Sequence, residues 1–176
     1  MLFRSLQSIF GFNFRIIHGY PAQADVRFAA AKGEIDGHCA LLVSTLKTDL
    51  WDGYKSGRIK VVIQANVETH PDIPEVPNAF QLAKSPDDIA VLKLVFTPWA
   101  FGRPIVAPPE TPQDRVEVLR AAFDATMRDP EFMDEIKKLN LEHRPITGAR
   151  AAALVDELFR SPPGVVERVR KMTQGP

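Results

Sequence analysis

The stretch GRPIVAPPETPQDRVEVLRAAFDATMRDPEF, residues 102–132, carries the clearest structural pattern in this sequence. Arg103 to Ala107 is a short apolar run that two prolines end, which favours a brief buried strand. Thr111 then offers an N-cap, Pro112 suits the first helical position, and Asp114 follows three residues after the cap. The stretch therefore predicts a strand, a proline-rich turn and a capped helix in succession.

The predicted helix, over 112–128, has one apolar face. The members of this face recur at helical spacing and are Val116, Leu119, Phe123 and Met127. Asp129-Pro130 repeats the signal of a cap followed by a first-turn proline. A second helix is therefore predicted over 130–139.

Short apolar runs alternate with helical patterns along the rest of the chain. Further strands are predicted at 14–17, 39–43, 59–63 and 143–146. Further helices are predicted at 6–10, 22–32, 78–82, 148–160 and 163–173. Another is predicted to begin at the cap Ser44-Thr45 and to end at Gly57. One more is predicted to begin at Ser85-Pro86 and to end at Pro98 and Gly102. This alternation predicts an α/β fold with mainly parallel strand pairing.

Composition argues against several classes of protein. The 176 residues include 22 basic and 22 acidic side chains, so no charge excess points to nucleic acid or an anionic membrane surface. The single cysteine, Cys39, excludes an intrachain disulfide. Four scattered histidines show no zinc-type spacing, and no apolar run reaches the length of a membrane span. No cofactor or metal is therefore expected.

Candidate catalytic groups are sparse. Cys39 follows His38, but adjacent strand residues point to opposite faces, which argues against a nucleophile and base pair. Glu34 and Asp36 lie two residues apart in a predicted turn, where carboxylates are usually solvated. No phosphate-binding loop or dinucleotide fingerprint is present. We therefore expect no enzyme activity, and an α/β enzyme fragment using Glu34, Asp36 or His38 is kept as the alternative.

Four segments, taken in order, are similar to one protein family. They are FNFRIIHGYPAQADVRFAAAKGEIDG (12–37), VVIQANVETHPDIPEVPNAFQLA (61–83), the stretch 102–132, and ITGARAAALVDELFRSPPGVVERV (146–169). Together they resemble the solute-binding receptors of tripartite tricarboxylate transporters, the Bug or TctC-like family. The resemblance covers the chain from about Phe12 to its end.

The resemblance implies a periplasmic-binding-protein-like (type II) fold of two lobes around a cleft, truncated at its N-terminus. Residues 12–101 would form most of lobe two, and residues 102–176 the C-terminal part of lobe one with its closing helices. The implied function is capture of a small carboxylate in the periplasm for the membrane subunits of the transporter. An inactive structural fragment is a further alternative.

The first residues do not fit this family. MLFRS lacks the extended apolar region of a signal peptide. Leu-Phe-Arg-Ser is also what CTCTTCCGATCT encodes, which resembles the end of a common sequencing adapter. We therefore expect residues 1–11 to be a non-native start and a helix remnant, with the gene extending upstream and lobe one incomplete. Uncovered apolar surface would then make the chain marginal, aggregation-prone or dimeric.

Two loops are predicted to hold the carboxylate, because each leads from a strand into a helix whose free N–H groups favour anions. The first contains Tyr20 and Ala22, and the second contains Ser44 and Thr45. Tyr20 would wall the cleft and donate from its hydroxyl, while the second loop would donate hydroxyl and backbone N–H groups. The competing interpretations are packing at a strand end for Tyr20 and simple helix capping for Ser44 and Thr45.

Overall fold

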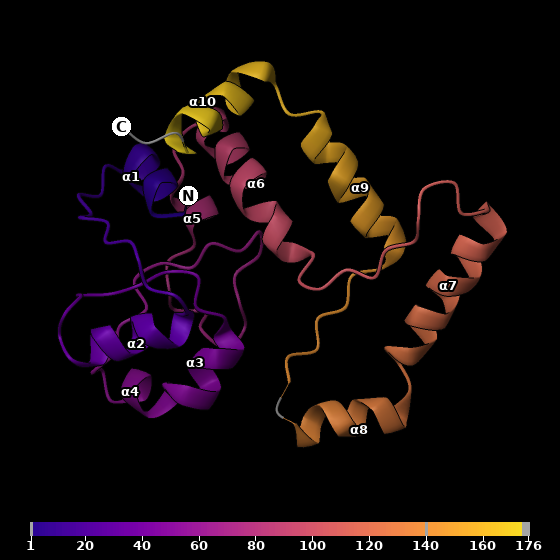
Figure 1. Ribbon diagram of the computed structural model, residues 1–176, viewed down its shortest axis with the longest axis horizontal. Coiled ribbons are helices and arrows are strands. Elements are labelled where there is room, and N and C mark those ends of the chain that lie inside the picture. Colours follow the sequence, from indigo (N-terminus) through magenta and orange to yellow (C-terminus); the bar gives the residue numbers. More distant parts are fainter. Residues whose placement is uncertain (1, 140, 174–176) are drawn as a thin grey trace.

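A computed structural model describes residues 2–139 and 141–173 of the chain (Figure 1). The helices are α1 Leu2–Phe10, α2 Gln23–Ala31, α3 Val43–Asp49, α4 Trp51–Lys55, α5 Ala79–Leu82, α6 Pro86–Ala100, α7 Gln113–Thr126, α8 Pro130–Lys138, α9 Gly148–Phe159 and α10 Pro163–Thr173. Every helix predicted from the sequence has a counterpart among them. The segment predicted to follow Ser44 is split at Leu50 into α3 and α4.

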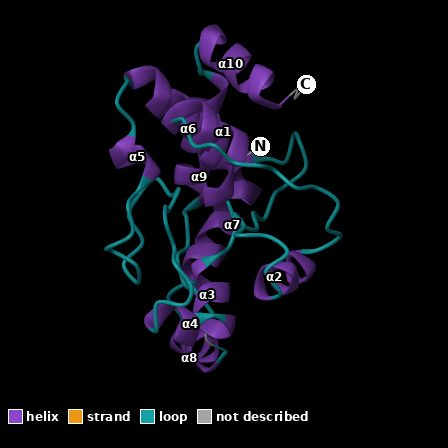
Figure 2. Ribbon diagram, turned by 90° about the vertical axis from the view of Figure 1, so that its left-hand side faces the viewer, coloured by secondary structure: helices purple, strands orange, loops and turns teal. Residues whose placement is uncertain are grey.

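The predicted α/β fold is wrong. Within the described part of the chain no strand forms, and the one β-bridge joins Gln64 to Asn78 in parallel (Figure 2). The periplasmic-binding-protein-like arrangement of two lobes is overturned with it, because that arrangement is built around sheets. The predicted division at residues 101 and 102 stays a prediction.

Four of the five predicted strands, at 14–17, 59–63, 103–107 and 143–146, are irregular segments. The fifth, at 39–43, is irregular up to Leu42, and Val43 begins α3. A strand needs a neighbour that accepts and donates its backbone hydrogen bonds, and no such neighbour lies beside these runs. Some of their apolar side chains face solvent instead, with Ile105 84% and Val62 72% exposed. Others are half-buried against the rest of the fold, among them Leu41, Val61 and Ile63. A short apolar run indicates burial only where other elements supply a surface to bury it.

Local caps explain why the helices were predictable. The Asp88 backbone N–H donates to the Ser85 hydroxyl at 3.0 Å and so caps α6. The Phe132 N–H donates to the Asp129 carboxylate at 3.0 Å at the start of α8. The Phe80 N–H donates to the Asn78 side chain at 2.9 Å before α5. Each bond lies within three residues of its cap and needs no tertiary partner.

Several details of the helix predictions are wrong. Pro112, and not Thr111, precedes the first residue of α7, and the Thr111 hydroxyl donates backwards to the Pro108 carbonyl at 2.7 Å. Pro98 lies inside α6 instead of ending it. Leu119, assigned to the apolar face of α7, is 58% exposed, so this face is not fully buried.

The larger of two apolar clusters lies where α6, α10 and α1 meet. Val91 and Leu92 of α6 are fully buried, and Val165 of α10 packs beside them. Asp88 at the start of α6 accepts from the Arg168 guanidinium at 2.7 Å, which ties α6 to α10. The Ser85 hydroxyl and Arg168 both lower the pKa of the Asp88 carboxyl.

The smaller cluster lies beneath α3 and α4. Leu46 of α3 is buried against Ile73 and Val76 from the proline-rich loop. Trp51 and Tyr54 of α4 pack partly against the same three side chains. This cluster therefore attaches the loop over 70–77 to the helices, although the loop has no regular structure of its own.

Helices α7 and α8 form an arm that stands away from both clusters (Figure 1). Neither helix contributes a buried residue. The accessible surface of the chain is 12,598 Å², whereas a compact monomer of its 19.6 kDa would expose about 8,600 Å². The arm and the unpaired segments leave much apolar surface in contact with water.

Candidate functional site

One buried side chain organises the loop that borders the candidate site. The amide of Gln64, 5% exposed, donates to the carbonyls of Ile73 and Val76 at 3.0 and 2.8 Å. Its oxygen accepts from the His70 backbone N–H at 2.7 Å. These bonds satisfy the His70 N–H and the Val76 carbonyl, which would otherwise lack a partner, so they hold the loop in one shape.

His70 links this loop to a distant part of the chain. Its side chain is 5% exposed, and its Nδ1 accepts from the Asp72 backbone N–H at 3.2 Å. An accepting Nδ1 assigns the proton of the neutral ring to Nε2. Nε2 lies 3.1 Å from a Glu142 carboxylate oxygen, in the connection between α8 and α9. The imidazole is therefore held from both sides.

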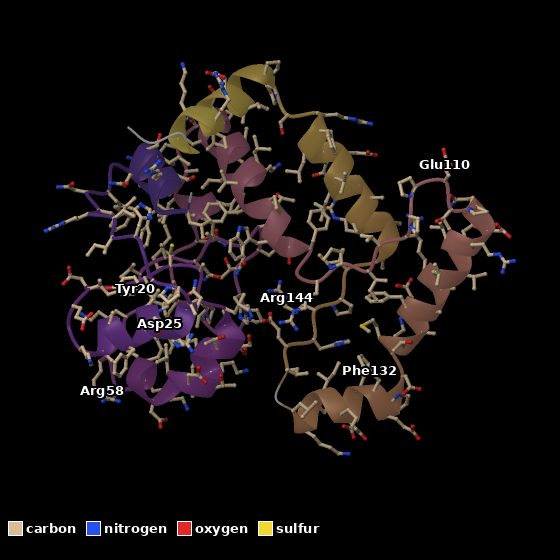
Figure 3. All side chains as sticks on the ribbon, in the orientation of Figure 1. Tyr20, Asp25, Arg58, Glu110, Phe132 and Arg144 are labelled. Atoms are coloured by element: carbon tan, nitrogen blue, oxygen red, sulfur yellow. The ribbon has the colours of Figure 1, made fainter. Side chains whose placement is uncertain are left out.

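A pocket of about 600 Å³ lies between α3, the His70 loop and the connection that follows α8. Ser44, Lys47, Thr48 and Trp51 line one side, and Lys137 and Arg144 are among the residues on the other. The labelled Arg144 lies in the gap between the α3 side of the body and α8 (Figure 3). Hydroxyl donors, cations and an aromatic ring thus surround one space.

The charges around this pocket are partly compensated. Lys47 donates to the Asp72 carboxylate at 2.9 Å, and this bond is the main reason that the pKa of Asp72 is lowered. Arg144 lies 3.8 Å from Glu142, a distance too long for a hydrogen bond. The residues that line the pocket include three cationic side chains and two carboxylates, so their formal net charge is positive when both histidines are counted as neutral.

A second carboxylate fixes the outer end of the loop. The Tyr54 hydroxyl of α4 donates to Glu75, and this bond raises the pKa of Tyr54 to about 12. The same bond is the largest cause of the lowered pKa of Glu75. Together with Lys47 and Asp72, it joins α3 and α4 to the loop by two polar contacts.

The structure brings one of the four predicted ligand residues to this pocket. Ser44 lines it, and its neighbour Thr45 is half-buried in α3 without being part of the lining. Tyr20 and Ala22 lie at the start of α2, outside the lining, and Figure 3 shows Tyr20 well apart from Arg144. A role in ligand binding stays a prediction for all four.

The competing interpretation of Ser44 and Thr45 as helix caps is wrong. Helix α3 starts at Val43, and its N-cap residue is Leu42, which makes no side-chain capping bond. Both hydroxyl residues therefore lie within the first turn of the helix.

The remaining lining residues were missed in the sequence. Lys47 and Lys137 resemble ordinary surface lysines, and Arg144 lies within the short strand predicted at 143–146. Only the three-dimensional approach of α3 to the connection near Arg144 makes them neighbours, and nothing local records that approach. The one available signal was His70 beside the rigid loop PDIPEVP, residues 71–77.

The groups of the alternative enzyme interpretation are not gathered at the pocket. Glu34 and Asp36 are exposed, and neither they nor His38 belong to its lining. His38 has a buried Nδ1 without a hydrogen-bond partner. Burial raises the pKa of the Cys39 thiol, which disfavours the reactive thiolate.

No protein-family model, curated protein or solved structure matches this chain. Over residues 2–139 and 141–173, no group of three histidine, cysteine, aspartate or glutamate side chains is placed to hold a metal ion. None of the helices in these two ranges combines the length and the apolar character that a membrane span requires.

Proposed function

We propose that this chain captures a small carboxylate and presents it to the membrane subunits of a tripartite tricarboxylate-type transporter in the periplasm. The resemblance of four segments, over 12–37, 61–83, 102–132 and 146–169, suggests the transport role. The pocket beside α3 suggests where the carboxylate binds.

The observation that carries the proposal is the set of donors around this pocket. Arg144, Lys137 and Lys47 surround the same space as the Ser44 hydroxyl. A guanidinium offers several N–H donors in a fork that matches a carboxylate, and an ammonium adds a point charge. Lys47 already donates to Asp72, so a carboxylate entering here meets chiefly the Arg144 and Lys137 donors, whose nearest acids lie 3.8 Å away.

The pairings of the free protein leave donors available. Lys137 lies 3.8 Å from Asp134, and both side chains are largely exposed. Arg144 approaches Glu142 at 3.8 Å, so neither cation makes a short bond in the pocket. Exposed ion pairs of this kind contribute at most about 1 kcal/mol, and a bound ligand can displace them. Trp51 adds an apolar wall for the carbon skeleton.

Ligand-dependent stabilisation tests the proposal. The thermal midpoint of the intact chain is measured against increasing concentrations of succinate, citrate and benzoate, with chloride at equal ionic strength as the reference. Binding at 100 times Kd stabilises the folded protein by about 2.7 kcal/mol. A saturable rise with at least one carboxylate, and none with chloride, is the expected result.

Matched arginine variants assign the site. Arg144→Gln is expected to reduce the affinity at least tenfold, because it removes the charge from the pocket. Arg160→Gln is the control, since Arg160 is an exposed arginine at the end of α9 and does not line the pocket. Equal effects of the two variants, or no stabilisation by any carboxylate, would show that the proposed site is wrong.

A further inference from the structure

The segment Pro104–Ile105–Val106–Ala107–Pro108, here called the PIVAP segment, combines exposure with an unpaired backbone. Ile105 is 84% and Val106 80% exposed, the highest exposures among the large aliphatic side chains of the described residues. In the part of the chain that the structure describes, the backbone N–H groups of residues 105–107 make no hydrogen bond. An apolar run with free N–H and C=O groups is a template for strand pairing.

We propose that two copies of this chain associate about a two-fold axis by antiparallel pairing of their PIVAP segments. The axis passes between the two Val106 residues. Ile105 of each copy then lies opposite Ala107 of the other, and Pro104 lies opposite Pro108. The result is a closed dimer, because a two-fold contact uses the same surface on both partners.

The spacing of the prolines identifies a second copy as the partner. In an antiparallel pair, hydrogen-bonded and non-hydrogen-bonded positions alternate. When the two Val106 residues face each other at a non-hydrogen-bonded position, Ile105 of one copy and Ala107 of the other form backbone hydrogen bonds with each other. Pro104 and Pro108 then fall at non-hydrogen-bonded positions, where a missing N–H costs nothing. The segment is symmetric about Val106 in this respect, so its own copy fits it as a partner.

Local conformation favours the same arrangement. A residue that precedes proline is disfavoured in the helical region and adopts extended backbone angles. Arg103 precedes Pro104, and Ala107 precedes Pro108, so both ends of the segment are biased towards a strand. Little backbone order therefore has to be gained when two segments meet.

The exposed surface is more than large enough to supply a dimer interface. The accessible surface of 12,598 Å² exceeds that of a compact monomer by about 4,000 Å². Obligate homodimers bury about 2,000–5,000 Å² in total, which is about 1,000–2,500 Å² from each chain and less than this excess. Val118 and Leu119 of α7, at 65% and 58% exposure, supply further apolar surface in the helix that follows the segment. A formal net charge of zero adds no general repulsion between copies.

Sedimentation equilibrium on the intact chain tests the association itself. The expected result is a monomer–dimer equilibrium between 5 and 200 μM protein, without larger species. Ile105→Asp is expected to weaken the dimer at least tenfold, since it places a charge in the paired segment. Val62→Asp is the control, because Val62 is 72% exposed in another unpaired segment. A monomer throughout, open-ended oligomers, or equal effects of both variants would overturn the proposal.

Cysteine cross-linking tests the register. In a Cys39→Ser background, Val106→Cys places two thiols at a non-hydrogen-bonded pair, where Cα atoms lie about 4.5 Å apart and a disulfide fits. Ile105→Cys places them diagonally, about 7–8 Å apart, which is too far. With oxidised glutathione as the oxidant, the Val106→Cys chain is expected to form disulfide dimers at least tenfold faster. Equal rates, or a faster Ile105→Cys chain, would disprove this register.

Discussion

The Nε2 atom of His70 lies 3.1 Å from an Oε1 oxygen of Glu142, across a sequence separation of 72 residues. This contact joins the proline-rich loop of the body to the connection between α8 and α9. It also closes one side of the candidate carboxylate pocket, because both residues belong to the lining. The position of the connection, and hence of Arg144, depends on it.

Glu142→Ala is expected to release this connection. Loss of the acceptor leaves the largely buried His70 ring without its Nε2 partner, which costs about 1–3 kcal/mol locally. Amide hydrogen exchange should therefore accelerate over residues 141–147. Glu142→Gln keeps a carbonyl oxygen that can accept from Nε2, so it is expected to preserve most of the protection. Equal exchange in both variants would contradict a role for the hydrogen bond.

Gln64→Leu is expected to disrupt the loop over 70–77. The substitution keeps a similar volume but removes three buried hydrogen bonds. It leaves the His70 N–H and the Val76 carbonyl unpaired, while the Ile73 carbonyl keeps its bond from the Val76 N–H. The cost should be about 3 kcal/mol or more. Trp51 fluorescence during urea unfolding measures it, since Trp51 packs on the cluster that contains Ile73 and Val76. As a control, Gln113→Leu on the exposed face of α7 should shift the transition by less than about 0.5 kcal/mol.

The bond from Tyr54 to Glu75 predicts a loss of stability at alkaline pH. The folded pKa of Tyr54 is raised from 10.0 to about 12, so the contribution of the bond is complete below pH 10 and declines as the pH rises towards 12. Tyr54→Phe removes the hydroxyl alone. The difference in thermal midpoint between the natural chain and this variant should therefore be constant from pH 6 to 9 and shrink above 10. A constant difference up to pH 11.5 would refute the assignment.

Leu92→Ala should destabilise the larger apolar cluster by about 3 kcal/mol, because the side chain is fully buried between α6 and its neighbours. The helical signal in circular dichroism, followed through urea unfolding, measures this loss. Leu119→Ala is the matched control, since Leu119 is 58% exposed on α7. The control should change stability by less than about 0.5 kcal/mol. Comparable losses would mean that α7 is buried in solution.

Local signals in the sequence predicted the helices, and the structure confirms them. Ser85, Asn78 and Asp129 cap helices through bonds to residues two or three positions ahead, so the pattern contains both partners. Strands differ, because their partners lie elsewhere in the chain. The runs around Val62 and Ile105 have strand composition, but no neighbouring segment completes a sheet around them.

The candidate site was predictable only in part. Ser44 was identified from its place before a helix, and it lines the pocket. The pairing of His70 with Arg144 could not be predicted in this way, because they lie 74 positions apart and no short motif contains both. The role of the Gln64 amide could not be predicted either, since a lone glutamine in an apolar run does not indicate the three hydrogen bonds that its side chain makes.

The division of the apolar side chains into two clusters, with none buried in α7 or α8, determines how this chain loses its structure on heating. Cooperative melting requires that all elements share contacts, so that none can open alone. We therefore expect the arm formed by α7 and α8 to detach first, followed separately by the two packed regions. Calorimetry would record a broad endotherm whose van't Hoff enthalpy falls short of the calorimetric one.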